Sequence, residues 1–188
     1  MNYHFISDDN YIIPGIRYIV EDIGVTAFFH NVSETRAQDS ELFLPQSGDV
    51  VCIIVNNTHI RSRLLRNPAL SRCRLLIMLD IPLIPSPLTH FPWLLPKNTS
   101  MKDFADVHQI AARTLVFRKA VTRDIQVLFD ELGNGKSPAS LSGGSRTDMQ
   151  SVYRIKRNVF REFGLMNCNS AGILLCRDIF AMKNTRVK

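Results

Sequence analysis

Basic side chains recur at helical spacing between residues 151 and 165. Arg154, Arg157 and Arg161 lie at positions i, i+3 and i+7, so a helix would carry them on one side. DNA recognition needs cations that neutralise phosphates and forked donors that reach base edges, and an α-helix fits the major groove. This segment is therefore a candidate DNA-binding helix. Base contacts are predicted from Tyr153, Arg154 and Arg157, and phosphate contacts from Lys156, Arg161 and Arg146.

The simpler alternative for this segment is a solvated cationic face without a ligand. Two features argue against it. The opposite side of the same helix is apolar, with Val152, Ile155, Val159, Phe160 and Phe163. Residues 1–117 contain 10 Lys and Arg against 11 Asp and Glu, whereas residues 118–188 contain 13 against 6. Such a charge split is typical of a polyanion-binding module attached to a near-neutral one.

Two adjacent carboxylates, Asp8 and Asp9, follow the apolar run Tyr3 to Ile6. They are either a residual metal site or helix caps, and N-capping of the next helix by Asp9 or Asn10 is the favoured interpretation. The five histidines are scattered, and no glycine-rich phosphate loop or nucleophile motif is present. We therefore expect no catalytic residue, no metal and no cofactor, and a protein that is not an enzyme.

The composition favours a packed cytoplasmic protein without a membrane partner. The chain has 188 residues, 45% of them hydrophobic, but no run near the roughly 18 apolar residues of a membrane span. Its start lacks the basic and apolar regions of a signal peptide. The cysteines are far apart and include no C-x-x-C pair, which favours buried, reduced thiols; a redox pair of Cys168 and Cys176 is the alternative.

The N-terminal part alternates short apolar runs with helical patterns, which indicates βαβ units around a parallel sheet with helices on both faces. A proline-rich loop is expected from Ile81 to Pro92. The predicted strands are Tyr3 to Ile6, Val25 to Phe29, Asp49 to Val55, Arg74 to Leu79 and Trp93 to Leu95. The predicted helices begin near Ile12, at Thr58 (ending at Leu70) and after the Ser100–Asp103 capping box, with an apolar stripe up to Leu115.

From Thr122 onward every segment has a helical pattern. The first helix ends at Gly133–Gly135, and a short second one begins at Ser137-Pro138. Thr147 or Asp148 caps the third, which is the basic helix, and Ser170 to Met182 forms the fourth. Short helices with tight glycine turns, followed by a basic amphipathic helix, form a helix-turn-helix pattern.

This C-terminal region resembles the LuxR/NarL/FixJ family of helix-turn-helix domains. The stretch VTRDIQVLFDELGNG (121–135) resembles the family's opening helix, and SVYRIKRNVFREFGL (151–165) its recognition helix. In that register the family's main base-contacting positions fall on Tyr153, Arg154 and Arg157. The sequence departs from the family at Gly143 and Gly144, which would cost about 1 kcal/mol each inside the scaffold helix and so shorten it.

The resemblance also implies a dimer on paired half-sites, either of this chain with itself or with another LuxR-type regulator. The natural dimer surface would be the fourth helix, through Ile173, Leu174 and Phe180. The alternative for these residues is plain packing onto the other three helices.

The N-terminal region resembles a response-regulator receiver domain that has lost its chemistry. FISDDNYIIPGIRYIVED is similar to the first strand, acidic turn and first helix, and WLLPKNTS to the fifth strand and lysine turn, with Lys97 in the lysine position. The position of the phosphoryl-accepting aspartate falls on Ile54 or Val55, with Asn56 next. None of these can accept a phosphoryl group, so Asp8, Asp9 and Lys97 are interpreted as a vestigial site.

The sequence thus predicts an α/β, flavodoxin-like receiver domain (1–117), a linker (118–121) and an all-α, tetrahelical helix-turn-helix domain (122–188). The expected function is a LuxR-type transcriptional regulator that binds double-stranded DNA and is controlled without phosphorylation. The alternative is an interaction protein that pairs with and modulates another LuxR-type regulator.

Overall fold

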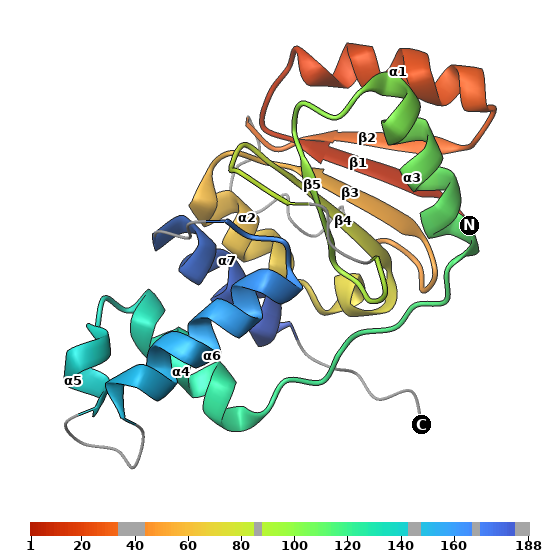
Figure 1. Cartoon of the computed structure of the whole chain (residues 1–188). Coiled ribbons are helices and arrows are strands. Elements are labelled where there is room, and N and C mark those ends of the chain that lie inside the picture. Colours follow the sequence, from red (N-terminus) through yellow and green to blue (C-terminus); the bar gives the residue numbers. More distant parts are fainter. Residues whose placement is uncertain (34–43, 85–87, 143–147, 167–169, 183–188) are drawn as a thin grey trace. The chain divides into compact units, whose positions relative to one another are not determined.

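The computed structural model describes residues 1–33, 44–84, 88–142, 148–166 and 170–182. The chain divides into two compact units (Figure 1). The sheet unit comprises Met1–Ile81, Leu88–Arg118 and Met182–Lys188, and the helical unit comprises Pro82–Pro87 and Lys119–Ala181. The predicted linker therefore begins inside the sheet unit. Arg118 donates hydrogen bonds there to the carbonyl oxygens of Ser71 (2.9 Å) and Leu70 (2.6 Å).

The sheet unit is built on five parallel strands in the order β2-β1-β3-β4-β5. This order reverses direction between β1 and β3, as in the flavodoxin-like doubly wound fold. The central strands are apolar at nearly every position because helices cover both faces of the sheet. The strands are β1 (Tyr3–Ser7), β2 (Ala27–Asn31), β3 (Val50–Ile54), β4 (Arg74–Leu79) and β5 (Trp93–Pro96).

Helices α1 (Ile12–Ile23) and α3 (Met101–Arg113) lie together on one face of this sheet (Figure 1). Helix α2 (Thr58–Leu65) lies on the other, because right-handed crossovers that run in opposite directions along a sheet place their helices on opposite faces. The aromatic core under α1 and α3 includes stacked Phe91 and Trp93, with ring centroids 4.6 Å apart.

The predicted helix from Thr58 to Leu70 is shorter than expected. Helix α2 ends at Leu65, and a 3₁₀ helix (Pro68–Arg72) follows. Pro68 lacks the N–H that a continuing helix needs, and the Asn67 side chain caps the new turn by accepting a hydrogen bond from the Ala69 N–H at 3.0 Å. Similarly, α3 ends at Arg113, and Leu115 is exposed rather than part of its apolar stripe.

The helical unit contains α4 (Arg123–Gly133), α5 (Pro138–Ser142), α6 (Met149–Glu162) and α7 (Ser170–Ala181). Its core is aromatic: Phe129 is fully buried and meets Phe160 and Phe180 edge-on, with centroids 6.1 and 5.2 Å away. The predicted break at Gly143 and Gly144 lies outside the described residues.

A short piece of the proline-rich connection after β4 belongs to the helical unit. Leu83 forms an antiparallel bridge with Leu165, and the Ile84 N–H donates to the Gly164 carbonyl at 2.8 Å. The prolines of this piece predict only a loop of the first domain. Its contacts instead fix the chain just after α6, where Gly164 adopts a positive φ of 68° that favours glycine.

Candidate functional site

Helix α6 is the element that carries the predicted DNA-contacting side chains. Its start is fixed by Asp148, whose carboxylate accepts a hydrogen bond from the Ser151 N–H at 2.5 Å. This bond lowers the pKa of Asp148, since it stabilises the charged form. Of the two predicted caps, Asp148 is therefore the one observed, and Thr147 lies outside the described residues.

One side of α6 is anchored in the core of the helical unit. Val152, Val159 and Phe160 are buried, and Phe160 meets the Phe129 ring edge-on. Because buried side chains recur every three or four residues, the rotation of the helix about its axis is fixed. The opposite side must therefore face outward.

The outward side of α6 presents an aromatic and cationic row. Tyr153 is 48% exposed, and Arg154, Arg157 and Arg161 are exposed as well. Arg157 makes no hydrogen bond or ion pair with the described part of the chain, so its five donors are available to a ligand. The structure thus places Tyr153, Arg154 and Arg157 together on one accessible face.

The two other arginines of the row are held by short polar neighbours. The Arg161 guanidinium donates to the Asn158 side-chain oxygen at 3.0 Å, and that of Arg154 lies 3.4 Å from the Ser151 hydroxyl. Asn158 was not predicted as a site residue. Its i, i+3 spacing from Arg161 was the signal that could have identified it.

Of the three predicted phosphate-contacting residues, only Arg161 is observed on the outward row. Lys156 is half-buried, and its ammonium lies 5.3 Å from the centroid of the Phe160 ring, within cation–π range. Lys156 is thus drawn toward the core side of α6 and away from the outward row. Arg146 lies outside the described residues.

The predicted dimer surface on α7 requires a correction at Phe180. This side chain is buried and packs against Phe129 and Phe163, with centroids 5.2 and 6.1 Å away. It belongs to the core of the helical unit because it fills the space between α4 and the end of α6. Ile173 and Leu174 are half-buried.

The receiver-like carboxylates lie at the carboxyl end of the sheet, where each has a partner in the chain. Asp8 accepts hydrogen bonds from the backbone N–H groups of Asn56 (3.0 and 3.1 Å) and Asn57 (2.8 Å). Asp9 accepts one from the Tyr11 N–H at 2.9 Å and pairs with Lys97 at 3.6 Å. The structure therefore brings Asp8, Asp9 and Lys97 to one end of the sheet, as the receiver resemblance implies.

These residues do not fit the Mg²⁺ site of a phosphorylated receiver. Magnesium requires about six oxygen ligands in near-octahedral geometry. Ile54 and Val55, which occupy the acceptor position, are buried and apolar, and the Ser7 hydroxyl donates to the Ile54 carbonyl at 3.1 Å. The oxygens of Asp8 and Asp9 already accept bonds within the chain.

The described residues hold few other groups that could form a site. They contain no group of three His, Cys, Asp or Glu side chains placed to hold a metal ion. Cys52 and Cys73 are buried free thiols, Cys176 is buried as well, and Cys168 lies outside the described residues. No helix in this part of the chain is long and apolar enough to cross a membrane.

No family model matches the sequence, and no curated protein matches it. Several solved structures are similar. A complex of the two-component response regulator RcsB with DNA shares 14% identity with this chain at a TM-score of 0.47, and the match covers 94% of this chain and 98% of the RcsB chain. RcsB from Salmonella enterica serovar Typhimurium, bound to a promoter, shares 11% identity at a TM-score of 0.39, and the match covers 94% of this chain and 98% of that RcsB chain. ChrA, a response regulator of a heme-sensing two-component system, shares 13% identity at a TM-score of 0.34, and the match covers 93% of this chain and 94% of the ChrA chain.

Proposed function

We propose that this protein is a sequence-specific, DNA-binding transcriptional regulator of the LuxR type. The observation that carries the proposal is the outward row of Tyr153, Arg154 and Arg157 on a helix whose other side is buried. An arginine fork donates two hydrogen bonds to the O6 and N7 atoms of guanine. A recognition helix contacts base edges mainly through its N-terminal half, where Tyr153 and Arg154 lie, and Arg157 follows Arg154 by three residues.

The remaining cations supply sequence-independent affinity. Arg161, which lies on the outward row and is held by Asn158, and Arg146 are the proposed phosphate contacts, whereas Lys156 is turned toward the Phe160 ring. One recognition helix gives modest affinity, so we propose binding to paired half-sites as a dimer, with this chain or another LuxR-type regulator as partner. Ile173 and Leu174 are the proposed contacts. A protein that reads chromosomal DNA in this way acts in the cytoplasm of a bacterium.

We further propose that phosphorylation does not control this regulator. Ile54 and Val55 offer no nucleophilic oxygen, and the nearby Asp8 is occupied by the backbone N–H groups of Asn56 and Asn57. A carboxylate held in this way is a poor nucleophile for a phosphoryl group.

Genome-wide mapping of bound DNA, followed by anisotropy measurements on the fragments found, tests the DNA-binding proposal. Arg157→Ala should abolish the preference for particular DNA sequences. The affinity of the wild-type protein for DNA should fall steeply as the salt concentration rises. Lys102→Ala removes one exposed cation from α3 in the sheet unit and should leave both unchanged. If the wild type binds no fragment but co-purifies with another regulator, the interaction-protein alternative replaces this proposal.

A further inference from the structure

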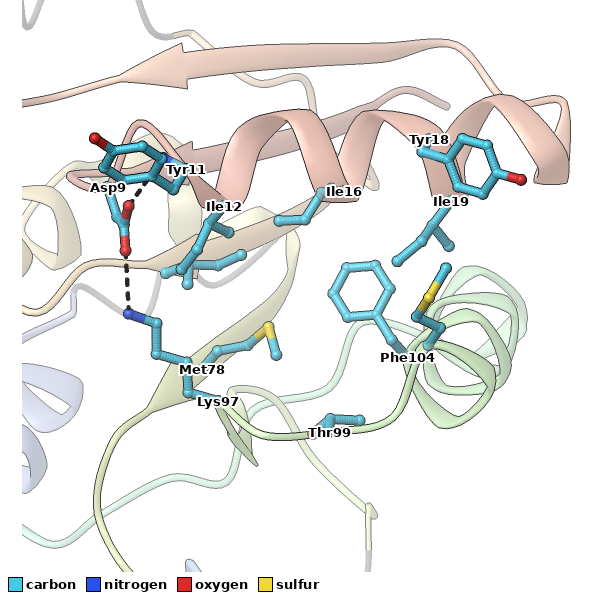
Figure 2. Close-up of a pocket in the computed structure, with 13 residues that line it drawn as sticks. Asp9, Tyr11, Ile12, Ile16, Tyr18, Ile19, Met78, Lys97, Thr99 and Phe104 are labelled. Carbon is cyan, nitrogen blue, oxygen red and sulfur yellow. Dashed lines mark hydrogen bonds and ion pairs between the residues drawn. The ribbon is translucent and has the colours of Figure 1, made fainter.

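A cavity of about 740 Å³ opens between α1 and α3 in the sheet unit (Figure 2). Ile12, Ile16 and Ile19 point into it from α1, and Phe104 faces them from α3. Ile54 and Met78, at the ends of β3 and β4, line it from the sheet. Its volume falls within the roughly 300–1,000 Å³ of small-molecule sites, which are mostly apolar with a few polar groups.

The polar end of the cavity offers hydrogen-bond donors from a lysine. Lys97 and Asp9 meet there at 3.6 Å (Figure 2). One Asp9 oxygen is taken by the Tyr11 N–H and the other by Lys97. The Lys97 ammonium has three donors, forms an ion pair with Asp9 and donates no hydrogen bond to the described residues. The Lys97 ammonium therefore has donors available for an acceptor oxygen of a ligand.

We propose that this cavity binds a small amphipathic molecule that ends in an acceptor oxygen, as a carboxylate or a carbonyl. The apolar body lies between Ile16 and Phe104, and the oxygen accepts a hydrogen bond from Lys97. The loss of an acid at Ile54 makes the site compatible with such a ligand, because an apolar side chain there attracts hydrocarbon and provides no metal ligand.

Methionine methyl groups provide a direct readout of binding. Met78 and Met101 line the cavity, whereas Met149 and Met166 belong to the helical unit. Decanoate, added below its micelle-forming concentration to protein with ¹³C-labelled methionine methyl groups, should shift the signals of Met78 and Met101 saturably. It should leave those of Met149 and Met166 in place. Absence of a saturable shift, or equal shifts of all four signals, overturns the proposal.

Gly15 allows the cavity to be filled without disturbing the fold. It lines the cavity on α1, and a Cβ atom there would meet no other atom within 4 Å. Gly15→Leu should weaken decanoate binding by more than about tenfold while the melting temperature stays equal or rises, since leucine is the better helix former. Undiminished binding by this stable variant places the ligand elsewhere and overturns the proposal.

The polar end is tested by a charge-removing pair of variants. Lys97→Gln should weaken decanoate binding about tenfold, and Lys102→Gln, which removes an exposed lysine outside the cavity, should not. Decan-2-one separates the two accepted chemistries. A stronger effect of Lys97→Gln on decanoate identifies a carboxylate site, and an equal effect a carbonyl site. Decylamine, which carries only donors, should bind weakly; binding as tight as that of decanoate overturns the proposal.

Discussion

His108 makes the stability of the sheet unit depend on pH. It is 2% exposed in α3, and its ring lies 4.1 Å from that of Phe104 and 5.5 Å from that of Phe5. Its Nδ1 atom is 2.7 Å from the Phe104 carbonyl oxygen, which can only accept, so Nδ1 carries the proton. The buried Nε2 atom has no hydrogen-bond partner among the described residues. A second proton would therefore place an unpaired charge among aromatic rings.

The cost of that charge can be estimated from linkage. Burial lowers the pKa of His108 from 6.5 to about 4. The unfolded chain takes up the proton near pH 6.5, so between pH 6.5 and about 4 it binds more protons than the folded protein. The free energy of unfolding therefore falls with decreasing pH by up to 1.4 kcal/mol per pH unit. Acidification from pH 6.5 to 5 should cost about 2 kcal/mol through His108 alone.

Urea unfolding at pH 7 and pH 5, followed by the fluorescence of Trp93, measures this effect. Trp93 is the single tryptophan and is buried in the same core cluster of the sheet unit. His108→Leu should shrink the difference between the two pH values by about 2 kcal/mol, leaving the part due to His30, whose pKa burial also lowers to about 4. The exposed His59→Leu serves as the control. An unchanged pH difference in His108→Leu would refute the reasoning.

Three other predictions concern packing, phosphorylation and thiol reactivity. Phe129→Ala should lower the free energy of unfolding of the helical unit by about 3–5 kcal/mol, as measured by the circular dichroism of its helices. DNA binding should be lost when this unit unfolds. A variant with full helix content and full DNA binding would contradict the proposed core. Acetyl phosphate should leave the protein unlabelled on a phosphate-affinity gel, and a phosphorylated Asp8 or Asp9 would show that the site retains its chemistry. Burial raises the pKa of Cys73 to about 12 and also raises that of Cys52. Both thiols should therefore react with Ellman's reagent only when the protein unfolds. Rapid reaction of the native protein would contradict their burial.

The central strands were predictable because their environment is uniform. A strand covered on both faces needs apolar residues throughout, and the run from Asp49 to Val55 has that composition; β3 covers Val50–Ile54. The edge strand β2 was predicted two residues early, at Val25 to Phe29 rather than Ala27–Asn31. An edge strand is partly exposed, so its composition defines its ends less sharply.

The side chains of α6 and α7 show why periodicity located one face and missed another. Polar and apolar residues alternate on α6 with helical spacing, so the outward position of Arg157 followed from the pattern. Helix α7 is apolar on nearly all sides, so no spacing could distinguish the buried Phe180 from the half-buried Leu174. The position of Lys156 over the Phe160 ring likewise depends on packing that the pattern does not contain.

The pair of carboxylates shows the limit of local interpretation most clearly. The sequence leaves two interpretations of these acids open, a metal site and capping of the next helix, and both involve neighbouring residues only. The expected cap by Asp9 or Asn10 is wrong, because Tyr11 is the N-cap of α1 and no side chain caps this helix. Asp9 accepts from the N–H of Tyr11 itself, and Asp8 binds backbone N–H groups 48 and 49 residues away, before α2. This contact exists because β1 and β3 are adjacent and parallel, so that their carboxyl ends meet.

Because both acids already have partners in the chain, Lys97 is the group at this end of the sheet with unused donors. It lies beside a cavity lined largely by hydrocarbon. Ile54, at the end of β3, offers no nucleophilic oxygen and forms part of the apolar wall of the proposed ligand site.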